Sequence, residues 1–354
     1  MITRRLFTRG LLGTAIGGIA PRLAQAQAPA QGGEMVFCSW GGAYQEAIRR
    51  AWIAPFAQRS GARVREDTNP ELARIKAMVD TNTVSWDVVT GGGSTLMEGA
   101  QQGLFEPIPA SVDQSNTYPN ARYDFGVPSE IFSTVFAFSK RTFPDGRPQP
   151  QTWADFFDVA RFPGKRSVYN RPQTVLEAAL MADGVAPGEV YRVLDTPAGQ
   201  DRAFAKLAQL KPHVAQWWSS GAQPVQVLGS GDAVMSLGWN GRFQAGLDEG
   251  LEIKQVFNGQ VAQLGFFMVV KGARNKETAF RFLNWMVSVE AQAEFHKYIA
   301  YGPVTPRAYE RIPEARWDNL PGSPRARIEL FLDIAWWSRN ARTVQERYQT
   351  FIQS

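Results

Sequence analysis

Histidine and cysteine, residues that often carry acid–base, nucleophilic or metal chemistry, are scarce in this chain. The 354 residues include two histidines and one cysteine. His213 and His296 belong to no nucleophile motif, and the sequence holds no Gly-x-Ser-x-Gly elbow. The histidines and Cys38 also lack the spacing of a metal-ligand cluster. We therefore predict no catalytic residue, no metal site and no cofactor.

Two glycine-rich segments are placed where they could bind a small molecule without reacting with it. Residues 39–43 follow an apolar run, so their glycines let the backbone approach a ligand while Trp40 offers an aromatic face. Residues 91–95 follow another apolar run and form a second candidate ligand loop. Its free backbone N–H groups could bind a ligand, together with three residues: Gly93, Ser94 and Thr95. This second loop lacks the lysine of a phosphate-binding P-loop. A core role for Trp40 and a plain helix cap at 91–95 remain the alternatives.

The elements that must position these loops alternate along the chain. Short β-rich apolar runs are expected at 35–38, 63–67, 86–90, 131–138, 167–169, 214–217, 233–237, 253–256 and 266–270, with helical patterns between them. Such alternation is typical of α/β layers built on largely parallel sheets. The chain length favours two lobes with separate cores, because single cores rarely grow that large.

Two helices are predicted from a 3.6-residue period of apolar side chains. The first covers residues 44–52 and is expected to end at Pro55, and the second covers residues 278–287. The proline-rich residues 144–150 read as a connector. Residues 34–137 with 264–310 are expected to form lobe 1, and residues 138–263 with 311–354 to form lobe 2.

Residues 1–28 have the layout of an export signal that is removed. Arg4 and Arg5 precede a weakly apolar run, a pattern closer to twin-arginine export than to the general secretory signal, which stays the alternative. Removal of this segment, with its four arginines and no acid, lowers the formal net charge from +5 to +1. A nearly neutral chain argues against nucleic acid or an anionic membrane as a partner, and no apolar run reaches the ~20 residues of a membrane span.

Seven segments, in order, resemble the spermidine/putrescine-binding branch of the ABC transporter solute-binding proteins. They are CSWGGAY at 38–44, WDVV at 86–89, TWADF at 152–156, FPGK at 162–165, MSLGWNG at 235–241, NKETA at 275–279 and YGPVTP at 301–306. The resemblance covers nearly all of the chain after the signal. It implies the periplasmic-binding-protein type II fold, in which two α/β lobes are joined by hinge strands and close on a ligand between them.

The resemblance also implies a set of ligand-contacting side chains in these motifs. They are Trp40, Tyr44, Trp239, Asn240 and Tyr301. For Tyr301 the alternative is a residue that only supports the Pro-Gly turn beside it. Related two-lobed proteins bind ferric ion through paired tyrosines, and this chain has no adjacent tyrosine pair. Ferric-ion capture and enzymatic turnover are therefore the weaker hypotheses.

The charge of the expected pocket departs from that of polyamine binders in the resembling family. Arg171 and Thr174 stand where the family has its first two acids, and Gln263 and Gly265 stand where it has an aromatic residue and another acid. An arginine beside the cleft can bind a carboxylate through two charge-assisted hydrogen bonds. The expected ligand therefore carries a carboxylate, with or without an amine, and Glu130 or Glu177 would be the counter-charge for an amine. The alternative is a polyamine or other amine held by aromatic faces.

These observations predict the periplasmic solute-binding component of an ABC importer. Its partners would be a small-molecule ligand and the membrane permease, with no nucleic acid and no stable membrane insertion. The chain is expected to be a monomer. Lobe closure on the ligand would give the permease a shape to recognise.

Overall fold

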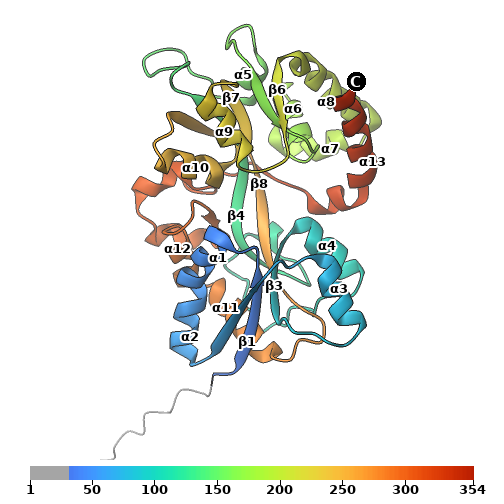
Figure 1. Cartoon of the computed structure of the whole chain (residues 1–354), viewed down its shortest axis with the longest axis vertical. Helices are drawn as coiled ribbons and strands as arrows, with labels where there is room; N and C mark the ends of the chain where they lie inside the picture. Colours follow the sequence, from blue (N-terminus) through green and yellow to red (C-terminus); the bar gives the residue numbers. More distant parts are fainter. Residues whose placement is uncertain (1–31) are drawn as a thin grey trace, which may run out of the picture.

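The computed structural model describes residues 32–354, so the predicted export signal at 1–28 lies outside the described residues. Figure 1 shows two bodies stacked along the long axis of the molecule. A mixed sheet runs through both in the order β2-β1-β3-β8-β4-β7-β5-β6, with β9 paired to β4 and β10 paired to β8. The chain therefore forms two α/β lobes that share one continuous sheet.

Two long central strands connect the lobes. β4 (Val127–Ser139) and β8 (Ile253–Val269) pair in antiparallel fashion, with irregular register between Pro128 and Ile131 and between Thr134 and Phe136. Both strands are rich in β-branched and aromatic residues, which favour extended backbone. A third connection is made by β10 (Leu330–Phe331), which pairs with β8 in parallel just before the last helix. The lobes thus meet at several crossings, as a hinge requires.

The lower lobe of Figure 1 is built around three parallel strands. These are β1 (Glu34–Ser39), β2 (Arg63–Thr68) and β3 (Val88–Gly92). The helices packed around them are α1 (Gly42–Ile48), α2 (Ala54–Ser60), α3 (Leu72–Asp80), α4 (Gly93–Gln101), α11 (Lys276–Met286) and α12 (Val289–Phe295). One core lies between β1, the first helices, α11 and α12, and a second lies on the other face of the sheet.

The upper lobe has its own parallel strands: β5 (Arg166–Tyr169), β6 (Val214–Trp218) and β7 (Met235–Trp239). Its helices are α5 (Trp153–Phe157), α6 (Val175–Ala182), α7 (Val190–Leu194), α8 (Pro197–Leu210), α9 (Gln223–Ser230), α10 (Asn240–Asp248) and α13 (Ile334–Gln353). The large core of this lobe runs from Phe136 to the C-terminal Tyr348. The chain therefore returns to the upper lobe at α13 and completes a core that begins some 200 residues earlier.

Most expected strands form within a residue or two of their predicted bounds, and three local predictions are wrong. The runs at 253–256 and 266–270 are the two ends of the single strand β8. The first helix does not end at Pro55, because a π-helical turn (Arg49–Ile53) leads into α2 and proline is tolerated in a first turn. The sheet is less parallel than expected, since β8 runs antiparallel to β3 and β4, and β4 runs antiparallel to β7 as well.

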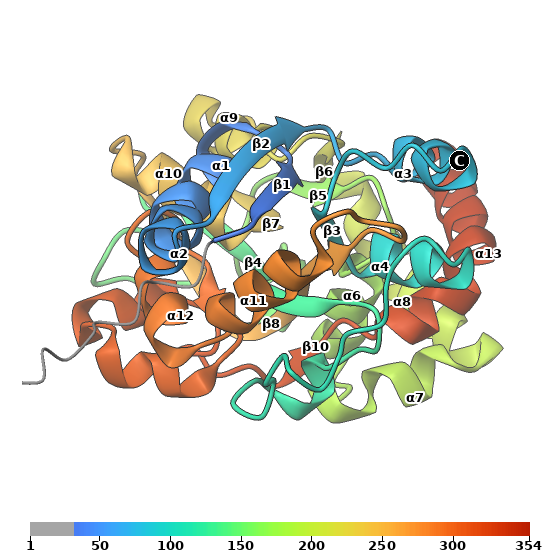
Figure 2. The ribbon, with the colours of Figure 1, turned by 90° about the horizontal axis from the view of Figure 1, so that it is seen from below.

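The expected lobe boundaries at 138 and 264 fall inside β4 and β8, in continuous strands and not in linkers. They stay predictions, as does the boundary at 311. Within residues 32–354, no helix combines the length and apolar character needed to cross a membrane. Figure 2 shows α4 and α13 on one side of the molecule, where Gln101 Nε2 donates to Ser338 Oγ at 3.5 Å between the lobes.

Candidate ligand-binding cleft

Two adjoining compartments open at the ends of the central strands. The larger has a volume of about 540 Å³ and the smaller about 260 Å³. Gly92, Phe132 and Trp239 line both, so the two compartments form one continuous cleft. Gly92 ends β3 and Trp239 ends β7, and the carboxyl ends of parallel strands are where open α/β sheets bind ligands.

The smaller compartment is an aromatic box around a buried acid. Tyr44 donates its hydroxyl to Glu130 Oε1 at 2.8 Å and lies 3.2 Å from Thr90 Oγ1. The ring centroids of Tyr44 and Tyr301 are 6.4 Å apart, and those of Phe132 and Tyr301 are 5.9 Å apart. Trp40, at the mouth, is 49% exposed. A cation entering this box would meet aromatic faces on several sides.

Glu130 is held in an environment that opposes its charge. The residue is 3% exposed, and its Oε2 has no hydrogen-bond partner among residues 32–354. Burial raises the pKa of Glu130 to about 7, although the hydrogen bond from Tyr44 favours the ionised form. A Cβ at Gly265 would lie 2.0 Å from Glu130 Oε1, so any larger residue at position 265 would displace the Glu130 carboxyl.

Trp239 is braced by a stack of aromatic rings in the upper lobe. Tyr169 stacks on Trp218 with ring centroids 4.1 Å apart, and Trp239 stands edge-on to both. The Trp218 indole donates to Leu237 O at 3.0 Å, which fixes the stack to the strand before Trp239. A Cβ at Gly221 would lie 2.7 Å from the Trp239 ring. The aromatic wall is therefore rigid before any ligand arrives.

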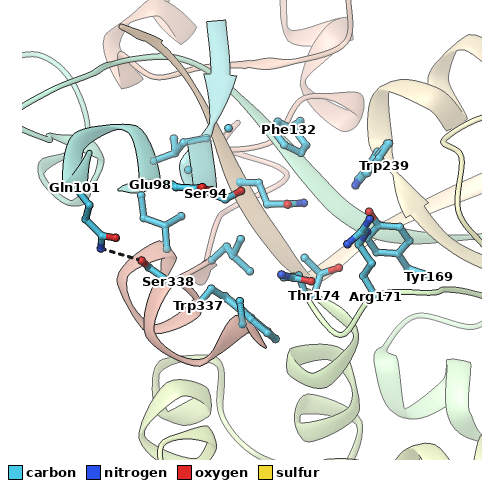
Figure 3. Close-up of a pocket in the computed structure, with 18 residues that line it drawn as sticks. Ser94, Glu98, Gln101, Phe132, Tyr169, Arg171, Thr174, Trp239, Trp337 and Ser338 are labelled. Atoms are coloured by element: carbon cyan, nitrogen blue, oxygen red, sulfur yellow. Dashed lines mark hydrogen bonds between the residues drawn. The ribbon is translucent and has the colours of Figure 1, made fainter. Parts of the chain in front are cut away.

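The larger compartment combines polar loops from both lobes. Figure 3 shows Ser94 and Glu98 of α4 on one side and Tyr169, Arg171 and Thr174 on the other. Thr174 is buried with φ 67°, a left-handed conformation that is costly for a β-branched residue and typical of functional sites. Burial raises the pKa of Tyr169, whereas the neighbouring Arg171 guanidinium lowers it.

Neither arginine of the cleft is paired with a carboxylate in the part of the chain that the structure describes. Arg171 lines the larger compartment and Arg242 the smaller one, and both are exposed. Among residues 32–354, no carboxylate lies within 4.0 Å of either guanidinium, although twenty-one such pairs form elsewhere in that part of the chain. Two free cations in a cleft can receive anionic groups from a ligand.

The last helix supplies a wall that the sequence reasoning missed. Ile334, Trp337, Ser338 and Ala341 of α13 line the larger compartment. They are spaced as one face of a helix, a signal that was present in the sequence. Trp337 donates its indole N–H to Glu177 Oε1 at 2.7 Å, and Tyr191 donates to the same oxygen at 2.7 Å. Glu177 lies behind this wall and not in the cleft.

Ten of the twelve predicted ligand residues line the cleft. They are Trp40, Tyr44, Gly93, Ser94, Glu130, Arg171, Thr174, Trp239, Gln263 and Tyr301. Thr95 turns away and packs against Gly91, where an added Cβ would lie 2.9 Å from it. Asn240 is buried because its amide is used internally: Oδ1 accepts from Ser133 N at 2.9 Å and Nδ2 donates to Ala300 O at 2.6 Å. These two therefore lie outside the cavity wall.

The other wall residues were not named as ligand contacts, although Gly91 and Gly92 belong to the predicted loop at 91–95, and most of them lie on the strands themselves. They are Thr90, Gly91, Gly92, Glu98, Gln101, Phe132, Tyr169, Gln173, Arg242, Leu264, Gly265 and Leu332. Phe132 lies two residues after Glu130 on β4, so it shares the face of Glu130. Arg242 stands at the start of a helix that follows a strand, a position that could have been recognised. Within residues 32–354 no three histidine, cysteine or acidic side chains are grouped as metal ligands.

Comparison with known proteins agrees with this architecture. Residues 51–324 match the family of bacterial extracellular solute-binding proteins. The gamma-aminobutyric acid-binding protein of Pseudomonas aeruginosa is 38% identical over 331 residues, which are 92% of this chain and 93% of that protein.

Solved structures show the same fold. An ABC transporter substrate-binding protein from Bradyrhizobium japonicum is 38% identical, with a TM-score of 0.82 over 91% of this chain and all of that one. The Atu4243-GABA receptor is 31% identical, with a TM-score of 0.78 over 90% of this chain and 97% of that one. The two lobes, the shared sheet and the cleft thus belong to the periplasmic-binding-protein fold. The chain belongs to the bacterial extracellular solute-binding proteins, and it is the non-enzymatic, solute-binding component of an ABC importer.

Proposed function

We propose that this protein captures a small solute carrying both an amine and a carboxylate, and that it delivers the solute to the permease of its importer. The family places the protein outside the cytoplasmic membrane. One observation carries the proposal: a buried carboxyl, Glu130, and an unneutralised guanidinium, Arg171, line the same cleft. A zwitterionic solute satisfies both groups, whereas a simple polyamine leaves Arg171 facing another cation.

The amine is assigned to the smaller compartment. An ammonium group beside Glu130 would give the unpartnered Oε2 a charge-assisted donor and would favour the ionised carboxylate that burial now opposes. The rings of Tyr44 and Tyr301 would contact the same cation by their faces. Each such contact contributes about 0.5–2 kcal/mol.

The carboxylate is assigned to Arg171 in the larger compartment. Arginine presents a planar pair of N–H donors that matches a carboxylate, and Ser94 and Gln263 add neutral donors to the same compartment. γ-Aminobutyric acid, named in two of the relatives above, carries an ammonium at one end and a carboxylate at the other. In a solute of this class, the ammonium could lie in the smaller compartment while the carboxylate lies in the larger one.

Closure of the lobes completes the proposed cycle. A ligand that contacts β3 and α4 in one lobe and β5 and β7 in the other binds the closed form better than the open one, and only that difference drives closure. The closed shape then docks on the permease. A monomeric state and twin-arginine export with removal of residues 1–28 belong to this proposal as well.

Calorimetry of the purified chain with γ-aminobutyric acid and with putrescine tests the proposal. We expect measurable affinity for the amino acid, little for the diamine, and a loss of about tenfold or more in Arg171→Gln. Arg141→Gln is the matched control, because Arg141 is exposed, pairs with Glu252 and lies outside the cleft wall. Tight binding of putrescine that Arg171→Gln leaves unchanged would replace this proposal with the amine-only reading.

A further inference from the structure

Arg242 is a cleft cation that a solute with one carboxylate does not use. It is the third residue of α10 and lines the smaller compartment, together with Glu130 and Tyr301. No carboxylate lies within 4.0 Å of it among the residues that the structure describes. The acid and the arginine of this compartment therefore leave room for an ammonium and an anionic group side by side.

Two glycines, Gly241 and Gly221, leave the space that the Arg242 side chain and its aromatic neighbours occupy. A Cβ at Gly241 would lie 2.5 Å from Tyr301 Cε1, so the start of α10 packs directly against the Tyr301 ring. A Cβ at Gly221 would lie 2.7 Å from the Trp239 ring and 3.3 Å from Arg242 Nε. The Arg242 guanidinium thus lies near the Trp239 ring, in the wall of the compartment that Glu130 and Tyr44 also line.

The two compartments differ in how their charges are arranged. In the smaller one, Glu130 is buried and has an unpartnered oxygen, which makes it a strong partner for an ammonium. In the larger one, Glu98 is the only acid among the described residues of the wall, and it is exposed and already accepts from Gln102 Nε2 at 3.2 Å. The larger compartment therefore favours an anion at Arg171 more than a second amine at Glu98.

We propose that Arg242 is a specificity-determining residue that binds a second carboxylate, adjacent to the amine, so that the cleft takes α-amino dicarboxylates. This inference rests on the proposed function, which assigns the amine to Glu130 and one carboxylate to Arg171. The α-amino and α-carboxylate groups occupy the smaller compartment, and the side-chain carboxylate passes Phe132 and Trp239 to reach Arg171.

The cleft has the capacity for such a solute. The ten heavy atoms of L-glutamate, at the ~30 Å³ that one water occupies, need about 300 Å³, and the compartments of about 540 and 260 Å³ together provide more than twice that volume. Lobe closure would remove part of the excess. The remainder is lined by amides and hydroxyls of Gln101, Gln173, Gln263 and Ser338, which suit a longer acidic chain.

γ-Aminobutyric acid and L-glutamate form a matched pair of probes, because they differ only by the α-carboxylate. We expect calorimetry to show glutamate binding about tenfold or more tightly than γ-aminobutyric acid, and Arg242→Gln to abolish that ratio. Arg242→Lys should restore part of it, because the charge returns without the planar pair of donors. Arg141→Gln, which lies outside the cleft wall, should leave the ratio unchanged, and circular dichroism confirms that each variant is folded.

The outcomes separate the two proposals. If γ-aminobutyric acid binds through Arg171 and Glu130 but Arg242→Gln leaves the glutamate ratio unaltered, the role of Arg242 is refuted and the proposed function stands. If glutamate binds more weakly than γ-aminobutyric acid in the unaltered protein, the dicarboxylate class is refuted. If neither solute binds and a diamine does, the proposed function itself fails. A loss of glutamate affinity in Glu98→Gln would move the amine to the larger compartment and contradict the inference.

Discussion

Glu130 and Glu177 are nearly equivalent acids in two different regions of the molecule. Both are at least 97% buried, both accept a tyrosine hydroxyl on Oε1, and in both Oε2 has no partner within residues 32–354. Burial raises the pKa of each to about 7. Glu130 lines the cleft, whereas Glu177 lies behind Trp337 in the core of the upper lobe. A perturbed acid is therefore no proof of a ligand site, and access to the cavity is what separates the two.

The sharpest test of this comparison is ligand affinity. Glu130→Gln should weaken binding of an amine-bearing solute about a hundredfold, because a neutral amide replaces a desolvated charge partner. Glu177→Gln should change affinity less than about threefold, since the glutamine oxygen can still accept from Trp337 and Tyr191. Calorimetry with γ-aminobutyric acid measures both. Equal losses in the two variants would show that Glu130 acts through the fold and not through the ligand.

Stability should respond to pH in the same way at both sites. Each carboxyl has a pKa of about 7 in the folded protein, above the ordinary value of 4.5, so the folded state binds more protons between these values. The free energy of unfolding therefore falls as pH rises from about 4.5 through 7, by on the order of 3 kcal/mol for each group. Urea unfolding should therefore show each glutamine variant to be more stable than the parent at pH 8. At pH 4.5 this gain in the free energy of unfolding should be absent.

Ligand then distinguishes the two acids again. Binding of an ammonium should release the proton from Glu130 near pH 7, which calorimetry detects in buffers of different ionisation enthalpy. Glu177→Gln should keep this proton release and Glu130→Gln should lose it. Proton release that survives in Glu130→Gln would place the amine elsewhere.

The smallest expected effect concerns the aromatic mouth. Trp40→Ala should weaken amine binding by about 1 kcal/mol, or roughly fivefold, because a half-exposed ring adds one cation–π contact and shields the box from water. Its Tm should stay within a few degrees of the parent, since little packing is lost. Unchanged affinity by calorimetry would remove Trp40 from the site. Trp239→Ala is the internal comparison, because that ring is braced and borders both compartments.

Much of the fold was predictable because its signals are local. The parallel strands β1, β3, β6 and β7 contain short apolar runs, and the loops that follow several of them reach the cleft. The prediction for β8 failed because residues 257–265 include Gly259 and Gly265, which read as a break. Pairing with β4 along its length keeps this segment extended. Pairing with a strand more than 100 residues away cannot be recognised from the residues of β8 alone.

The site was predicted in part for the same reason. Trp40 and Ser94 follow strands directly, so strand-end reasoning finds them. The face of α13 reaches the cleft only because the chain returns at its end to the upper lobe, and the missed Trp337 is held there by Glu177. Asn240 shows the reverse case: its neighbours Trp239 and Arg242 line the cleft, but its own amide is hydrogen-bonded to the backbone of Ser133 and Ala300, which are distant in sequence.

The sequence by itself determined the alternation of strands and helices and the glycine-rich loops that follow several strands, because these are properties of residue order. Only the tertiary structure decided that Glu130 faces the cavity while Glu177 does not, that Gly265 makes room for Glu130, and that Arg242 shares their compartment. Those facts depend on contacts between segments distant in the chain, where burial and neighbouring groups set the charge of each side chain.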